Sequence, residues 1–330
     1  MADLQYIGVD IGGTSIRAAR FGGHSHIPVA KTKTPTQASK GLEVVLDRLE
    51  AAIRQVAGRD LESVAGIGIA AAGPLNPHTG VVLNAPNLPG WQNLPLKQLM
   101  EDRLHRPIFI GNDANLAALG EWKFGAARDH QDVLYLTIST GIGGGVITSG
   151  RLLVGANGLG AEVGHMLAVP DGAMCGCGQR GHLEAMASGT AIAAAARARL
   201  KGGVAPTSKL WQLCGGDAGD VTGAMVGEAA LAGDEFAVGL IAEAGTFIGR
   251  TLASLLHAFN SSIVVCGGGV SLLGDVILNP IRTAVRQNVM SDAYWRDCPI
   301  VLAELGDDAG LVGAGALAME SVPAALPVAV

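Results

Sequence analysis

Two cysteines and two histidines with metal-ligand spacing lie in the middle of the chain, in the run Glu162-Val-Gly-His165 and Cys175-Gly-Cys177-Gly-Gln-Arg-Gly-His182-Leu-Glu184. Two thiolates and two imidazoles this close together can form the tetrahedral ligand set that zinc prefers. The alternative, free cysteines beside unrelated histidines, would have to explain a Cys-x-Cys-Gly turn with a histidine on each side. We therefore predict one structural zinc on His165, Cys175, Cys177 and His182.

The two glutamates that flank this cluster are suited to binding a polyhydroxylated ligand. Metal binding contributes roughly 10 kcal/mol or more to the folding of small metal-dependent peptides, so zinc would fix the loop that carries Glu162 and Glu184. Carboxylates on a fixed loop can accept hydrogen bonds from several hydroxyl groups, which is what a sugar offers. The sequence predicts a sugar site beside the metal.

Three glycine-rich segments follow predicted strands: Asp10-Ile-Gly12-Gly13-Thr14, Thr140-Gly141-Ile-Gly143-Gly144-Gly145 and Gly267-Gly268-Gly269. Because glycine has no Cβ, backbone N–H groups in such turns can approach phosphate oxygens closely. Asp10 could hold a magnesium ion through water, since hard cations prefer carboxylate and water oxygens. Any one segment could be a simple hairpin turn, but three at strand ends favour a nucleotide site.

Two other nucleotide motifs are excluded or discounted. The chain has no Gly-Lys pair and therefore no Walker A loop. The run Gly313-Ala-Gly315-Ala-Leu-Ala318 has the spacing of a dinucleotide fingerprint, but no strand follows it to complete a βαβ unit. We interpret that run as a site of close helix packing.

The segment Gly111-Asn112-Asp113-Ala114-Asn115 lies between a predicted strand and a predicted helix. A carboxylate there stays ionised near the helix N-terminus and could accept the proton of an attacking hydroxyl group. The competing interpretation is an ordinary N-cap, because Asp and Asn favour that position. On these residues alone the cap is the better interpretation.

The elements that position these residues alternate between strands and helices, which predicts an α/β fold. We expect strands at 6–10, 16–21, 64–70, 107–110, 133–139, 146–148 and 263–266. We expect helices at 41–56, from 113 to about 121, at 236–259 and at 308–320. The pattern restarts after Gly125, which indicates a hinge between two packed lobes.

Composition excludes several functional classes. The 330-residue chain is 49% hydrophobic and 16% charged, with a formal net charge of −6 and no block of Lys or Arg. We therefore expect no nucleic-acid surface. The N-terminus lacks the pattern of a secretory signal, and stretches such as 64–75 and 309–319 are too short to cross a bilayer. We expect a cytoplasmic protein without a membrane partner, whose five cysteines stay reduced.

Taken in order, these motifs resemble the ROK family of sugar kinases and sugar-responsive repressors. The resemblance extends from about Tyr6 to about Met319, and its most specific part is the segment from His165 through Cys175-x-Cys-Gly-x-x-Gly to Glu184. It implies a two-lobed actin/hexokinase-like (ribonuclease H-like) fold with ATP and sugar in an interlobe cleft. It assigns residues 1–125 plus 308–330 to a smaller lobe. Residues 126–307 form a larger lobe that carries the zinc loop and a dimer surface.

The family pattern also implies roles for individual residues. Asp113 is the catalytic base and also contacts the sugar, and Asp10 holds magnesium. The other sugar-binding residues are Gly73, Asn87, Asn112, Glu162, His165 and Glu184. The ATP-binding residues are Gly12, Gly13, Thr14, Thr140, Gly141, Gly143, Gly144, Gly267, Gly268 and Gly269.

One position departs from the family pattern, because His182 stands where a third cysteine is usual. Three thiolates and one histidine give a zinc site of net charge −1, whereas two of each give a neutral site. Zinc accepts both ligand sets. The departure bears on metal affinity and loop rigidity more than on catalysis.

The resemblance implies ATP-dependent phosphorylation of a hexose, with glucose to glucose 6-phosphate favoured. Mannose, fructose or an N-acetylhexosamine as acceptor, and polyphosphate as donor, stay open. Two rival classes are a ROK repressor and a non-catalytic actin-like ATPase. A repressor needs a helix-turn-helix segment before Tyr6, and an ATPase does not need Asp113, Glu162 and Glu184 together. A homodimer is expected from the family alone.

Overall fold

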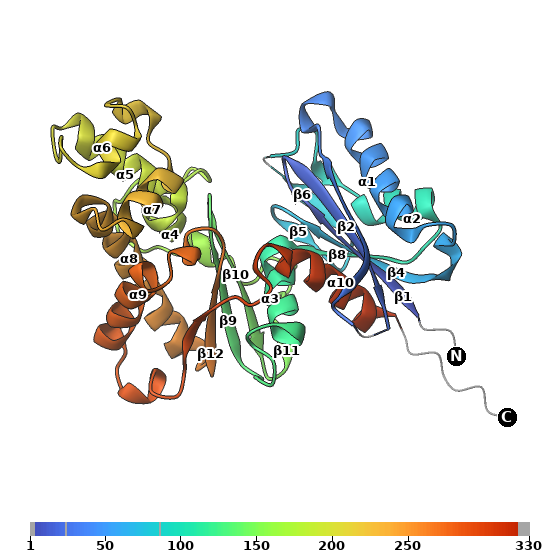
Figure 1. Ribbon diagram of the computed structural model, residues 1–330. Helices are drawn as coiled ribbons and strands as arrows, with labels where there is room; N and C mark the ends of the chain where they lie inside the picture. The colour runs from blue at the N-terminus through green and yellow to red at the C-terminus, as the bar shows by residue number, and fades with distance from the viewer. Residues whose placement is uncertain (1–3, 24, 86, 323–330) are drawn as a thin grey trace. The chain divides into compact units, whose positions relative to one another are not determined.

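The chain contains two compact units, seen in the computed structural model, which describes residues 4–23, 25–85 and 87–322 (Figure 1). Unit 1 comprises Met1–Arg128, Leu152–Ala161 and Asp307–Val330, as far as these residues are described. Unit 2 comprises Asp129–Arg151 and Glu162–Gly306. Residues 323–330, expected in the smaller lobe, lie outside the described residues.

Unit 1 is built on a five-stranded sheet with the order β3-β2-β1-β4-β8. The strands are β1 (Gln5–Ile11), β2 (Ser15–Gly22), β3 (Pro28–Pro35), β4 (Val64–Ala71) and β8 (Ile108–Asn112). β1 is antiparallel to β2 and parallel to β4, which is parallel to β8. A small sheet adds β5 (Leu75–Asn76), β6 (Val81–Asn84) and β7 (Gln92–Leu94). The four strands predicted in this unit are confirmed, with small differences at their ends.

The alternation of residues along β1 decides which helices cover each face of this sheet. Ile7, Val9 and Ile11 point into the main core, where they join residues of α1 (Leu42–Ala57) and α2 (Leu96–Leu104). Gly8 and Asp10 point to the opposite face, against α10 (Ala309–Ser321). Figure 1 shows α1 and α10 on opposite sides of these strands.

Helix α10 packs at backbone distance against β4 and against α3 (Asp113–Phe124). A Cβ atom built on Gly68 of β4 would lie 1.8 Å from the carbonyl oxygen of Ala314. A Cβ atom on Gly313 would lie 1.6 Å from the carbonyl oxygen of Leu116. The interpretation of the run Gly313–Ala318 as close helix packing is therefore confirmed.

Unit 2 repeats the strand order of unit 1, as β11-β10-β9-β12-β13. These strands are β9 (Val133–Ile138), β10 (Ile142–Thr148), β11 (Arg151–Leu152), β12 (Ile263–Gly267) and β13 (Ile300–Leu302). β9 is antiparallel to β10 and parallel to β12, which is parallel to β13. These four strands therefore have the same relative directions as β1, β2, β4 and β8 of unit 1.

The expectation of a long glycine turn at residues 140–145 is wrong. The turn is confined to Ser139–Gly141, and Gly143 and Gly144 lie within β10, opposite Thr137 and Leu136 of β9. A Cβ atom on Gly144 would lie 2.6 Å from a methyl carbon of Val163. The lack of a side chain at Gly144 therefore makes room for the segment that packs on β10. It does not serve a loop conformation.

The helices of unit 2 gather on one side of its strands in Figure 1. They are α4 (Leu183–Ala187), α5 (Gly189–Lys201), α6 (Lys209–Leu213), α7 (Gly223–Leu231), α8 (Glu235–Phe259) and α9 (Asp275–Asn288). Helix α8, which confirms the predicted long helix, is long and apolar enough by composition to cross a membrane. Its residues Leu240, Ile248 and Leu252 are buried inside the unit, so core packing accounts for its apolar character.

We predict that Gly68→Ala lowers the free energy of unfolding by about 3 kcal/mol, because the new methyl group would overlap the α10 backbone. The matched control is Gly22→Ala in β2, where a Cβ atom would meet nothing within 4 Å. Urea denaturation of both variants measures the difference. Equal stability of the two variants would contradict the close packing of α10.

Candidate active site

The turn between β1 and β2 holds the first predicted phosphate-binding segment. The N–H group of Gly12 donates to the carbonyl of Ser15 at 3.0 Å, and that of Thr36 donates to the carbonyl of Thr14 at 2.9 Å. A Cβ atom on Gly13 would lie 2.9 Å from the Cβ atom of Asn87. The predicted phosphate turn and the predicted sugar residue Asn87 are therefore neighbours.

Asn112 is the N-cap residue of helix α3. Its Oδ1 atom accepts hydrogen bonds from the N–H groups of Ala114 at 3.0 Å and Asn115 at 3.2 Å. Its Nδ2 atom donates to the carbonyl of Gly73 at 3.4 Å, which joins two predicted sugar residues. Asp113 is the first residue of the helix and is half-buried, and its Oδ1 atom also accepts a hydrogen bond from the N–H group of Ala114 at 2.8 Å. Asn112 thus satisfies the cap interpretation, and the role of Asp113 as base stays a prediction.

Gly310, in the first turn of α10, lies near both the predicted magnesium residue Asp10 and the predicted base Asp113. A Cβ atom on Gly310 would be 3.8 Å from Oδ2 of Asp10 and 3.9 Å from the carbonyl oxygen of Asp113. The Asp10 carboxylate forms an ion pair with Arg17 of β2, which sequence analysis did not single out. Unit 1 therefore brings the predicted magnesium residue and the predicted base to one helix terminus.

Glu184 of unit 2 is held against the turn between β9 and β10. Its Oε2 atom accepts a hydrogen bond from the N–H group of Ile142 at 3.0 Å. A Cβ atom on Gly141 would lie 2.4 Å from the same oxygen, so a larger residue there would displace the carboxylate. This contact explains why position 141 needs a glycine, which the glycine-rich motif alone did not explain.

Glu162 directly precedes the short 3-10 helix Val163–His165 and lies near Glu184 and His165. Although the residue keeps exposed surface, partial burial of its carboxyl group raises its pKa above the ordinary value. The positive charge available on His165 opposes this shift, and the negative charge of Glu184 adds to it. Unit 2 therefore gathers the three predicted sugar residues Glu162, His165 and Glu184.

The four predicted zinc ligands converge. Their ligand atoms all lie within 4.8 Å of one another. The distance from Sγ of Cys175 to Nδ1 of His165 is 3.7 Å, and that from Sγ of Cys177 to Nδ1 of His182 is 3.2 Å. Sulfur and nitrogen ligands of a tetrahedral zinc ion lie about 3.5 Å apart. The spacing therefore suits zinc.

Two glycines shape the loop that carries these ligands. Gly178 and Gly181 have φ values of +90° and +74°, which other residues adopt rarely. A Cβ atom on Gly181 would also lie 1.8 Å from the carbonyl oxygen of Val169. The glycines of the Cys-x-Cys-Gly-x-x-Gly pattern thus set the loop backbone.

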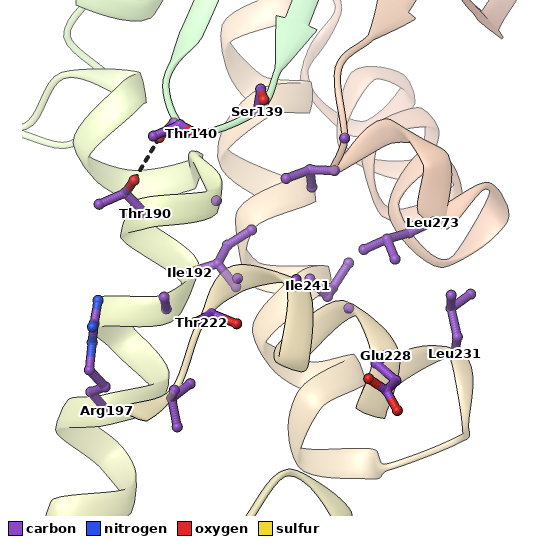
Figure 2. A pocket seen from close by; sticks show the side chains of 18 residues that line it. Ser139, Thr140, Thr190, Ile192, Arg197, Thr222, Glu228, Leu231, Ile241 and Leu273 are labelled. Atoms are coloured by element: carbon purple, nitrogen blue, oxygen red, sulfur yellow. Dashed lines mark hydrogen bonds between the residues drawn. The ribbon is translucent and has the colours of Figure 1, made fainter. Parts of the chain in front are cut away.

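A pocket of about 700 Å³ lies within unit 2, on the other side of the β9–β10 turn (Figure 2). The hydroxyl group of Thr190 donates to the carbonyl of Thr140 at 2.8 Å, and the N–H group of Gly189 donates to the carbonyl of Ser139 at 2.7 Å. Apolar side chains, including those of Ile192 and Leu273, line its interior.

Only part of the predicted ATP-binding set lines this pocket. Thr140 and Gly269 do, whereas Gly267 ends β12, where a Cβ atom would meet the Tyr135 hydroxyl oxygen at 2.5 Å. Sequence analysis missed the polar lining residues Thr190, Arg197, Thr222 and Glu228. The helix caps Ser188 and Thr222 were the available signals.

Comparison with known proteins identifies the family. The model of the ROK family matches residues 6–321. The chain belongs to the ROK family. This ROK chain is 36% identical to the glucokinase of Thermotoga maritima over 98% of its own length and 99% of the relative's. It is also 35% identical to the N-acetylmannosamine kinase of Citrobacter koseri, over 96% of this chain and 99% of that one.

A solved structure gives the corresponding comparison of folds. The crystal structure of a ROK family glucokinase from Streptomyces griseus in complex with glucose and AMPPNP has a TM-score of 0.82. The two sequences are 38% identical, and the match covers 96% of this ROK chain and 99% of that one. The prediction of an actin/hexokinase-like α/β fold is confirmed.

For this ROK chain we predict that Asn112→Ala lowers the free energy of unfolding by about 1 kcal/mol, the usual effect of removing an N-cap. Asp113→Asn keeps the cap and should leave stability nearly unchanged. Chemical denaturation of the two variants beside the wild type tests this assignment. A larger loss for Asp113→Asn would show that Asp113 has the structural role.

Proposed function

We propose that this chain is an ATP-dependent hexose kinase that converts glucose to glucose 6-phosphate. The observation that carries the proposal is the similarity, over nearly the whole chain, to a ROK glucokinase solved with glucose and AMPPNP. The local geometry agrees, because carboxylates suited to a base and to hydroxyl binding lie at strand and helix ends. A cytoplasmic location agrees with five free cysteines.

Asp113 acts as the general base in this proposal. Its carboxylate lies in the first turn of α3, where the helix dipole favours the ionised form. An ionised carboxylate can accept the proton of the sugar hydroxyl group as that oxygen attacks the γ-phosphate. Asn112 keeps the helix end capped, so Asp113 is not required for that role.

Residues suited to binding sugar hydroxyls occur in each unit. In unit 1 they are Gly73, Asn87, Asn112 and Asp113, and in unit 2 they are Glu162, His165 and Glu184. Nδ1 of His165 faces the Cys175 sulfur, so its Nε2 atom is available to a sugar hydroxyl group. Each carboxylate can accept more than one hydroxyl hydrogen bond.

The pocket in unit 2 accepts the nucleoside end of ATP. Thr140 lies at its edge, and the same turn contacts Glu184 through Gly141 and Ile142. One turn thereby connects the donor side of unit 2 with its acceptor side. When bound, magnesium neutralises phosphate charge. Asp10 would hold that ion through a metal-bound water, because Arg17 donates to Oδ2 of the carboxylate and leaves Oδ1 as the acceptor.

His165, Cys175, Cys177 and His182 would hold one structural zinc ion. The separations of the Cys175–His165 and Cys177–His182 pairs are close to those of a tetrahedral ligand set. The metal would stabilise the loop that positions His165 and Glu184, and it would take no part in phosphoryl transfer. We also propose a homodimer formed through unit 2, which light scattering after gel filtration would test.

A panel of hexoses with purified protein and Mg-ATP tests the principal proposal. We expect glucose to give the highest kcat/KM, with phosphate transferred to the primary hydroxyl group, and no turnover without magnesium. N-acetylmannosamine belongs in the panel because a relative is named for it, and polyphosphate should be tried as donor. A preparation with its metal content verified that forms no phosphosugar from any hexose would refute the kinase proposal.

Within that assay, Asp113→Asn should lower kcat by about 10²-fold or more while glucose and ATP still bind. The reason is that an amide cannot accept the hydroxyl proton. Calorimetric titration of the variant with glucose separates lost catalysis from lost binding. Normal turnover would place the base elsewhere.

Cys177→Ala should abolish zinc binding and raise the KM for sugar much more than the KM for ATP, because the metal loop carries sugar residues. His182→Cys should keep both metal and activity, since either residue completes a tetrahedron. Metal analysis and kinetics of each variant provide the measurements.

Cys214→Ala is the matched control for these variants, because Cys214 is a buried thiol outside the cluster. It should retain one zinc per chain. A zinc-free wild-type preparation with full activity would contradict a structural role for the metal. His165 would then be a sugar ligand alone.

A further inference from the structure

Arg17 of β2 holds one oxygen of the Asp10 carboxylate. The two residues lie directly opposite each other in the β1–β2 pairing. Nε and Nη2 of Arg17 both donate to Oδ2 of Asp10, Nε at 3.1 Å. The side chains are only 23% and 16% exposed. Both hydrogen bonds converge on Oδ2, so the carboxylate is fixed through one of its oxygens.

The other side of the Arg17 guanidinium group is also fixed. Nη1 donates to the carbonyl oxygen of Asp307 at 2.6 Å and lies 3.8 Å from Oδ1 of Asp308. Asp308 is paired in turn with Lys31 of β3, at 2.6 Å. Because a guanidinium group is planar, contacts on two sides determine its orientation and therefore that of Asp10.

We propose that Arg17 is a positioning residue that determines which oxygen of Asp10 is presented to the magnesium ion of the kinase reaction. This inference rests on the proposed function. By occupying Oδ2, Arg17 leaves Oδ1 as the acceptor for a metal-bound water. Outer partners of this kind orient the groups that hold a metal, and their loss typically lowers metal affinity or activity by about 10- to 100-fold.

A purely electrostatic role gives the opposite expectation. Arg17 also contacts the carbonyl oxygen of Asp307 and the carboxylate of Asp308, and Lys31 is a second cation paired with Asp308. If Arg17 acted only through its charge, removing that charge would leave the site more negative and strengthen cation binding. A positioning role instead predicts weaker cation binding, even when the charge is kept.

The test compares Arg17→Lys and Arg17→Met with the wild type. Lysine keeps the charge but cannot present a planar fork, so both variants should raise the half-saturating Mg²⁺ concentration about tenfold and lower kcat. Glucose affinity, measured by calorimetry without nucleotide, should change less than about twofold. Mn²⁺ titration followed by electron paramagnetic resonance, with AMPPNP present, gives a readout independent of turnover.

Lys31→Met and Arg20→Met are the matched controls. Lys31→Met removes a nearby charge that does not contact Asp10, and Arg20 is a half-buried arginine of the same strand bonded to Gln5. Neither control should change the Mg²⁺ requirement or Mn²⁺ affinity. Thermal unfolding of every variant separates this effect from a loss of stability.

Two results would overturn the proposal. One is a wild-type Mg²⁺ requirement and kcat in Arg17→Lys, and the other is tighter Mn²⁺ binding by Arg17→Met. A wild-type protein that phosphorylates no hexose would instead refute the proposed function. The Mn²⁺ titration would then still compare the Asp10 site among the variants.

Discussion

The close approach of helix α10 to β1, β4 and α3 is the constraint on which the site in unit 1 depends. Backbone atoms fill the space where side chains would normally pack, at Gly8, Gly68, Gly120 and Gly313. Interiors this dense transmit small displacements and do not absorb them. Since the first turn of α10 lies beside Asp10 and the Asp113 backbone, the packing of the whole helix sets the position of both aspartates. The cost of this arrangement is that no larger residue fits at these glycines.

In unit 2 a turn, and not a helix, brings the candidate site residues together. Its sheet has the same strand order, and the β9–β10 turn corresponds to the β1–β2 turn of unit 1. The two sides of that turn have different neighbours: Gly141 and Ile142 meet Glu184, whereas Ser139 and Thr140 meet α5 and the pocket. In open α/β sheets the carboxyl ends of neighbouring parallel strands converge, which explains why function collects there. Polar residues scattered along the sequence thereby become neighbours.

Structural features that depend on residues close together in the chain could be predicted from the sequence, and those that depend on distant residues could not. Strands with period-two patterns, the small-residue helix α10 and the Cys/His cluster are defined by nearby residues, and each was predicted. Gly143 and Gly144 were misplaced because a glycine that makes room for a packed segment has the same composition as a glycine in a turn. The lining of the pocket and the Arg17 contact to Asp307 depend on residues far apart in the chain, 290 positions in the second case. No local pattern reports such contacts.

In the loop that carries the proposed zinc ligands, the positions of the ligands do not depend on their chemical identity. Its path is set by backbone constraints, the positive φ values at Gly178 and Gly181 and the contact of Gly181 with Val169. These constraints, together with the backbone bridge between Leu167 and His182, do not involve the side chain at 182. Histidine can therefore stand where the family pattern has cysteine. The exchange changes charge: with zinc bound, two thiolates and two imidazoles sum to zero, whereas three thiolates leave −1. Coulomb repulsion between nearby like charges is substantial where solvent is partly excluded. Glu162 and Glu184 already repel each other, and a neutral metal site adds no further negative charge to the pair. His182 is therefore compatible with the same loop path, and with zinc bound it would reduce the negative charge near Glu162 and Glu184, the proposed sugar-binding carboxylates.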